Sequence, residues 1–222
     1  MPVSWVDIAN MALGRIGTSS RVTDLTASDK ASVTMNATMP TTAQSVLEGW
    51  DWKSVSTRTQ LTKDVTPPVF GFKNRYLLPA DPYCLVVREF RPQSYDWVIE
   101  GRYLLSNADS SQQPVFIRYT SFPTDPGVLT ALCAKAIAWR LAAETCNVFV
   151  QGNSQTGQTA IMREYQMVIE EAQGANQWLD RNHDEDAPYL LDALFRGHGS
   201  MKGLELSSGE SWVFGGSNQN TW

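Results

Sequence analysis

Apolar and polar residues follow different patterns in the ends and in the middle of the chain. In residues 5–16 and 28–47, apolar residues recur at the spacing of one helix face. From residue 53 to 119 short segments alternate apolar and polar positions, which is typical of half-buried strands. The helical spacing returns at Asp125 and continues to about residue 176. The pattern therefore predicts an α+β fold in which a bundle of four main helices is interrupted by one small antiparallel β domain.

Local signals indicate where the first two helices begin and end. Ser4 and Asp7 resemble a capping box, and Gly17 follows the last periodic residue of the first helix. Ser28 or Asp29 is expected to cap the second helix. Pro40 lies inside that second helix, and we expect it to kink or divide the helix because proline cannot donate a backbone hydrogen bond.

The third helix is predicted to start at Asp125, followed by Pro126, and to run to about residue 146. Residues 152–157 are expected to form a loop, after which a fourth helix follows. In the middle of the chain, Pro67 and Pro68 interrupt the strand pattern, and residues 100–102 are placed where a tight hairpin turn would fall. The predicted strands are residues 55–61, 70–78, 83–90, 97–100, 103–106 and 115–119.

These elements divide the chain into four segments. Residues 1–52 and 123–196 hold the helices of the bundle, residues 53–122 form the inserted β domain, and residues 197–222 form an extended tail. Gly49, Trp50 and Trp52 lie where the helical pattern changes to the β pattern. We expect them to form a hinge between the two parts.

The tail, residues 197–222, has a composition unlike the rest of the chain. It contains six glycines and five serines, and its large apolar residues stand apart from one another. Such a composition cannot build a core of its own. Trp212, Phe214 and Trp222 are therefore predicted to anchor the tail on a neighbouring subunit or partner; a tail without a role is the alternative.

Charge and composition restrict the partners. The chain has 222 residues, with 18 basic and 23 acidic side chains and a net charge of −5. It has no run of Lys and Arg of the kind that binds phosphate backbones, so we expect no sequence-specific or tight binding of nucleic acid. Charged residues make up 18% of the chain. A weakly charged, polar surface suits a protein that contacts other subunits, but an ordinary globular domain can share it.

The residue types that carry chemistry do not form a recognisable constellation, so we expect no enzyme activity and no catalytic, cofactor or metal site. His183 and His198 stand fifteen residues apart, and residues 184–186 lack the spacing of a calcium loop. The odd number of cysteines favours buried, unpaired thiols in a reducing compartment; they are Cys84, Cys133 and Cys146. The first residues lack the basic and apolar segments of a signal peptide, and no apolar run is long enough for a membrane span, so we expect a cytoplasmic protein or one incorporated into a particle there.

Eight tryptophans and the strand-rich middle leave a second interpretation open, a carbohydrate-binding or hydrolytic protein. Its candidate carboxylates are Glu89, Asp96 and Glu100. Against it, Trp5, Trp139 and Trp178 fall in helical patterns, where core packing is the usual role of tryptophan.

Several segments, taken in order, resemble the tail tubular protein A family, the adaptor of the head-to-tail connector of short-tailed bacteriophages. Residues 7–17 (DIANMALGRIG) resemble the opening helix of that family, and residues 46–52 (VLEGWDW) resemble its tryptophan hinge. Residues 72–79 and Asp81 resemble its strand that enters a proline turn, and residues 97–104, 115–119 and 122–123 resemble the strands before its alanine-rich helix. The resemblance covers about residues 3–180 and does not include the glycine-rich tail.

This resemblance implies a structural protein of the virion neck, made in the host bacterial cytoplasm. Its partners would be further copies of itself in a ring, typically of twelve, the portal protein above and the tail nozzle or tail tube below, with no membrane partner. The related head-completion proteins of long-tailed phages share the helical frame. The resemblance therefore predicts a connector more firmly than it predicts the type of tail.

Overall fold

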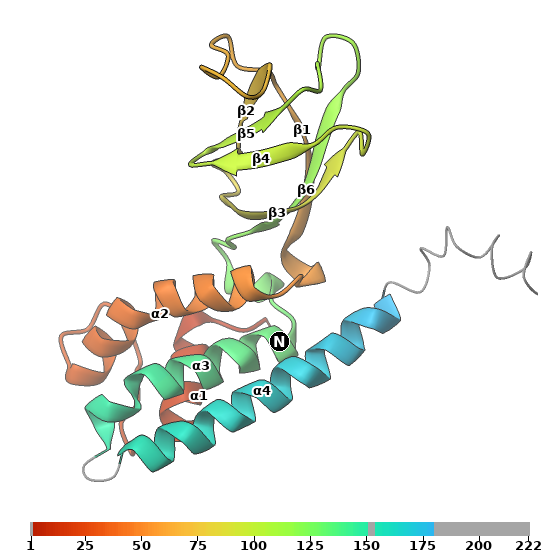
Figure 1. Cartoon of the computed structure of the whole chain (residues 1–222). Helices are drawn as coiled ribbons and strands as arrows, with labels where there is room; N and C mark the ends of the chain where they lie inside the picture. Colours follow the sequence, from red (N-terminus) through yellow and green to blue (C-terminus); the bar gives the residue numbers. More distant parts are fainter. Residues whose placement is uncertain (1, 151–153, 180–222) are drawn as a thin grey trace, which may run out of the picture. The chain divides into compact units, whose positions relative to one another are not determined.

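The computed structural model describes residues 2–150 and 154–179. The described part contains four α-helices and two small antiparallel sheets (Figure 1). The expected mixed α+β class is confirmed. The strands lie between the second and third helices in the chain order. The predicted extended tail lies outside the described residues.

The first two helices begin where the capping signals place them. Helix α1 spans Trp5–Ile16, and the backbone amides and side chains of Ser4 and Asp7 form the reciprocal hydrogen bonds of a capping box. Helix α2 spans Lys30–Gly49, and Asp29 caps it by accepting a hydrogen bond from a backbone N–H of the first turn. Pro40 does not divide α2, so that alternative was wrong. The helix continues because its apolar face is buried on both sides of the proline, at Met35, Met39, Ala43 and Leu47.

The third helix begins later than predicted. Asp125 caps a 3-10 turn, Pro126–Val128, instead of the helix itself. The backbone then becomes extended at Leu129, and Thr130 caps helix α3, Ala131–Phe149. Helix α4 spans Ser154–Leu179, so most of the loop predicted at residues 152–157 belongs to the helix.

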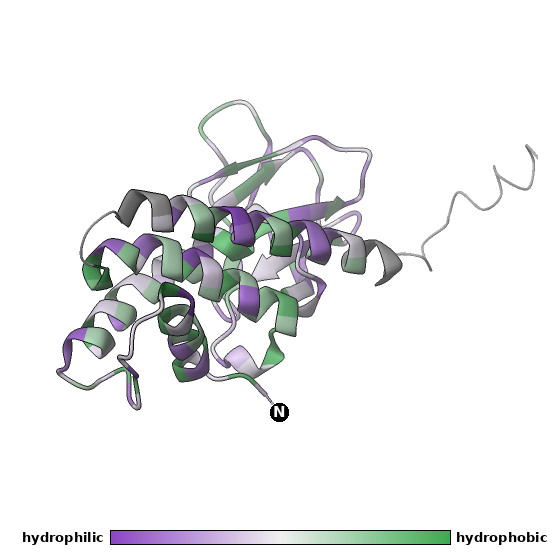
Figure 2. Cartoon of the chain, turned by 90° about the horizontal axis from the view of Figure 1, so that it is seen from below, coloured by the Kyte–Doolittle hydropathy of each residue, from purple (hydrophilic) through white to green (hydrophobic). Residues whose placement is uncertain are grey.

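Two clusters of buried apolar side chains join the four helices. Alanine and other small residues dominate the buried face of α3, which lets the neighbouring helices approach closely. In α4, Ile161 and Ala172 are buried, whereas Glu164 and Glu170 are exposed. Hydrophobic and hydrophilic segments accordingly alternate along the helices in Figure 2. The apolar residues that recur at helical spacing in the sequence are thus the residues that pack between the helices.

The strands form two antiparallel sheets of three strands each, in the orders β1-β6-β3 and β2-β5-β4. Gly101, with φ 58°, lies in the tight turn between β4 and β5, as predicted. Side chains from both sheets, including Tyr76, Phe90, Leu104 and Ile117, form a third buried cluster. The strands are β1 Ser56–Leu61, β2 Asn74–Leu77, β3 Cys84–Arg91, β4 Trp97–Glu100, β5 Tyr103–Ser106 and β6 Val115–Ser121.

The strand predictions were most accurate where the turns are short. Strands β4 and β5 have the predicted bounds. By contrast, the strand predicted at residues 70–78 begins only at Asn74, because Phe70 and Gly71 belong to an exposed loop. A short 3-10 turn, Lys53–Val55, precedes β1.

Candidate functional site

The end of α2 is the point where the helical part meets the strands, and we call residues 49–52 the joint segment. Gly49 is the last residue of α2 and Trp50 caps it. The last carbonyl groups of a helix have no partner within the helix, and a cation near them is favourable. However, the last turn of α2 contains no basic residue. The required donors therefore have to come from elsewhere in the chain.

Arg88, in β3, supplies most of these donors. Its Nη2 atom lies 3.1 Å from the carbonyl oxygen of Leu47, 2.9 Å from that of Glu48 and 2.8 Å from that of Trp50. Its Nε atom donates to the Thr120 hydroxyl at 2.9 Å. The indole Nε1 of Trp52 adds a hydrogen bond to the carbonyl of Val46 at 3.0 Å. A strand and a buried indole thus cap the C-terminus of α2.

A second arginine ties the joint segment to the sheet. Nη1 of Arg118, in β6, lies 2.9 Å from both carboxylate oxygens of Asp51, and its Nε lies 3.3 Å from Glu89. Burial by itself would raise the pKa of Asp51, but hydrogen bonds from Arg118 and Lys53 outweigh it and hold the pKa below its usual value. The Asp51 carboxylate is therefore ionised at neutral pH, and it pairs with a cation from a distant strand.

The three predicted hinge residues differ in their surroundings. Gly49 is exposed, and a Cβ atom built on it would meet no other atom within 4 Å. Trp50 is half-buried, and its Nε1 has no hydrogen-bond partner within the described part. Trp52 is 2% exposed and belongs to the helical core. The hydrogen bonds of Arg88, Arg118 and Trp52 hold the joint segment in the conformation described. That the segment acts as a hinge stays a prediction.

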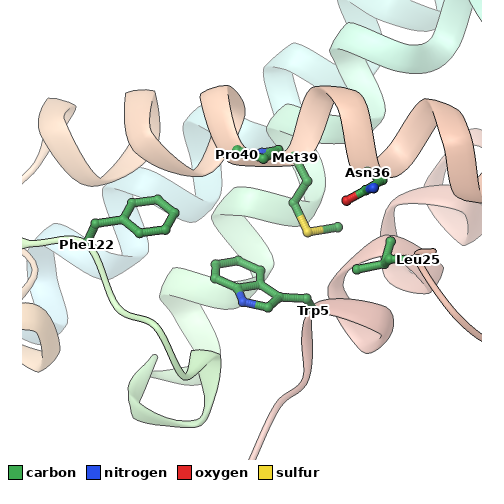
Figure 3. Close-up of a pocket in the computed structure, with 6 residues that line it drawn as sticks. All are labelled: Trp5, Leu25, Asn36, Met39, Pro40 and Phe122. Atoms are coloured by element: carbon green, nitrogen blue, oxygen red, sulfur yellow. The ribbon is translucent and has the colours of Figure 1, made fainter. Parts of the chain in front are cut away.

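A surface pocket lies beside α1 and α2 (Figure 3). The indole of Trp5 forms its floor and stacks on Phe122, with ring centroids 6.3 Å apart and an interplanar angle of 14°. In Figure 3 the Met39 side chain extends from α2 toward the Trp5 indole, and Leu25 lies to the right of both. The pocket has a volume of about 160 Å³, and the residues lining it are Trp5, Leu25, Asn36, Met39, Pro40 and Phe122.

The alternative carbohydrate or hydrolytic site rested on three carboxylates, one from the first sheet and two from the ends of one strand in the second. Glu89 lies in β3, whereas Asp96 precedes β4 and Glu100 ends it. A hydrogen bond from Arg91 and a second from Arg118 lower the pKa of Glu89 despite its partial burial. A general acid requires the opposite shift. Glu89 is therefore suited to an ion pair and not to proton donation.

The cysteines are unpaired and buried, as predicted. Burial raises the pKa of Cys84 to about 11 and that of Cys133 to about 12. In residues 2–150 and 154–179, no group of three or more His, Cys, Asp or Glu side chains is arranged to hold a metal ion. The histidines, residues 184–186 and the predicted anchors Trp212, Phe214 and Trp222 lie outside the described residues.

The sequence pattern did not identify Arg88 or Arg118 as residues of the joint. Both occupy ordinary polar positions within strands, and their partners lie between 29 and 67 residues away in the chain. Only the missing basic residue in the last turn of α2 signals that a donor must come from a distant element. The exposed apolar loop before β2 was also missed, since Pro67 and Pro68 were interpreted only as a break between strands.

No helix within the described ranges combines the length and the apolar character that crossing a membrane requires. In comparisons with protein-family models and with curated proteins, the chain matches neither a family nor an individual protein.

Proposed function

We propose that the chain is an adaptor subunit of a bacteriophage head-to-tail connector. In this proposal copies of the chain form a ring, typically of twelve, that binds the portal on one side and the tail nozzle or tail tube on the other. The four helices are the bundle that packs around the ring, and the six strands are a β domain inserted into it. DNA leaves through the ring without specific binding.

The observation that carries the proposal is the construction of the joint. Residues 46–52, which resemble the tryptophan hinge of tail tubular protein A, form the end of α2 and the segment that leads to the first strand. Arg88 and Arg118 fasten this segment to β3 and β6 through charge-assisted hydrogen bonds. Such bonds are stronger than neutral ones and restrict geometry.

A fixed joint suits an adaptor for a physical reason. A connector subunit has to hold one partner with one part and a second partner with another, and the spacing of the two must be the same in every subunit of the ring. Strands that are fastened to the end of a helix keep the two parts in one relation without a cofactor or a chemical step. The weakly charged surface, with 18% charged residues, is consistent with a protein whose outside contacts other subunits.

The decisive experiment is a mass measurement of the purified full chain with and without the portal protein of the phage that encodes it. We expect a monomer alone and a closed ring, bound to portal, after mixing. The matched control is a portal from an unrelated phage, which should leave the chain monomeric. Failure to bind the cognate portal, together with binding to a polysaccharide, would favour the carbohydrate-binding alternative.

A further inference from the structure

The loop between β1 and β2 exposes large apolar side chains at its tip. Val65 is 98% exposed, Val69 97% and Phe70 86%. Isolated apolar residues on a surface are common, but Val69 and Phe70 are adjacent in the chain, and both side chains are almost fully exposed. We call Val69 and Phe70 the knob.

The base of this loop is held firmly, so the knob is presented in a defined position. The backbone N–H of Asp64 donates to the carbonyl of Arg75 at 2.9 Å, and the two side chains form an ion pair at 2.8 Å. The Asp64 carboxylate also accepts a hydrogen bond from the N–H of Thr66 at 3.1 Å. Gly71, with φ 84°, turns the chain back after the knob. A loop that is already ordered loses little conformational freedom on binding.

The pocket beside α1 and α2 matches the knob in size and chemistry. Its volume is about 160 Å³, and an apolar cavity of about 150 Å³ is large enough to take a benzene ring. Trp5, Phe122 and Met39 offer an aromatic and thioether surface, on which a phenyl ring packs well.

The segments that carry the two surfaces differ in the sign of their net charge. Residues 53–122, which carry the knob, contain nine Lys and Arg against six Asp and Glu, whereas residues 1–52, which carry most of the pocket, contain three against five. The exposed Lys73 closely follows the knob, and the exposed Asp24 precedes Leu25 of the pocket. Opposite charges around an apolar contact steer association and fix its register.

We propose that the knob of one chain inserts into the pocket of a second copy of the chain. The two surfaces are different, so the contact is head-to-tail, and each subunit offers one knob and one pocket. Such a contact generates a ring when the rotation between subunits closes. The inference rests on the proposed ring and specifies which surfaces join its subunits.

Disulfide trapping tests the contact in the full chain. Chains carrying Val69→Cys, a change that is close in size and keeps the Phe70 ring, are mixed with chains carrying Asn36→Cys, exposed to a mild copper oxidant and separated on a non-reducing gel. A disulfide captures even a transient contact between chains that are monomeric before portal is added. The native thiols are buried and should not interfere. Pairing of knob and pocket should give at least fivefold more cross-linked dimer than a control in which Val98→Cys, another exposed apolar position in β4, replaces the knob variant. Equal amounts of dimer in both mixtures would overturn the proposal.

Assembly on the portal provides a second test. Phe70→Ser removes the knob, and Asn36→Arg covers the pocket from an exposed helical position; neither should unfold the chain. Each variant alone should form rings at least tenfold less well than the unaltered chain, and each still has one of the two surfaces. An equimolar mixture should therefore give heterodimers that cannot close into a ring. Asn36→Ala, which leaves the pocket open, is the matched control and should assemble normally.

The two proposals fail in different ways. If the unaltered chain forms rings on the portal and both variants do so equally well, the contact is wrong and the adaptor role stands. If the unaltered chain ignores the portal while the cysteine pair still cross-links selectively, the contact stands and the adaptor role is wrong.

Discussion

Nη2 of Arg88 in β3 lies 2.8 Å from the carbonyl oxygen of Trp50, the residue that caps α2. The same nitrogen also reaches the carbonyls of Leu47 and Glu48. One side chain thus connects a strand to the end of a helix that lies about forty residues earlier in the sequence. The stability of the helical part and the position of the strands therefore depend on the same group.

Replacing Arg88 by Met should destabilise the protein by about 2–3 kcal/mol, because charge-assisted hydrogen bonds are lost and partly buried carbonyls are left without donors. Chemical denaturation followed by circular dichroism measures the change. Arg58→Met, at an exposed position of β1, removes the same charge and should change stability little. Equal effects of the two substitutions would show that the contacts of Arg88 contribute nothing specific.

Gly49→Ala distinguishes a flexible hinge from a fixed joint. The residue is helical and a Cβ atom would meet nothing within 4 Å, so alanine should stabilise the protein by about 0.5–1 kcal/mol. Gly101→Ala is the opposite case, because its φ of 58° disfavours a side chain, and it should be destabilising. If ring formation on the portal survives Gly49→Ala unchanged, the glycine is not needed as a hinge. A loss of assembly in a stabilised protein would show that motion at this position is required.

Stability at acidic pH should depend on Asp51. The pKa of Asp51 is lower in the folded protein than in the unfolded chain, so its contribution is fully present above the unfolded pKa of about 4. The contribution is lost as the pH falls through the folded pKa. Asp51→Asn should therefore lower stability at neutral pH and flatten the loss of stability between about pH 5 and pH 2. Denaturation curves across this pH range test it, with Asp96→Asn at an exposed position as the control.

The sequence predicted well those features that are formed by residues close together in the chain. The capping box of Ser4 and Asp7 and the hairpin turn at Gly101 depend on residues within a few positions, and both were found where expected. The start of α3 was predicted too early because Asp125 and Pro126 suit the start of a 3-10 turn as well as the start of an α-helix. The extended backbone at Leu129 separates that turn from α3.

The joint and the pocket could not be predicted in the same way. Arg88 finds its partners only once β3 lies beside the end of α2, and the pocket joins Trp5 and Leu25 to Phe122, which is about a hundred residues away in the chain. Such sites depend on tertiary packing, and no spacing in the sequence encodes them. The change of pattern at residues 46–52 coincides with the end of α2, but it does not identify the arginines that hold the segment.

The apolar face of α3 gives a test of the helical core with an internal comparison. Ile137 is completely buried, Leu132 is only half-buried and Lys135 is exposed. Ile137→Asp puts an unpaired charge among apolar side chains of two helices, at a cost of several kcal/mol, which is much of the stability of an ordinary domain. We expect that variant to be insoluble or unfolded, Leu132→Asp to be folded with a lowered melting temperature, and Lys135→Asp to melt like the unaltered protein. Thermal unfolding by circular dichroism ranks the three, and normal melting of Ile137→Asp would mean that this face of α3 does not form the core.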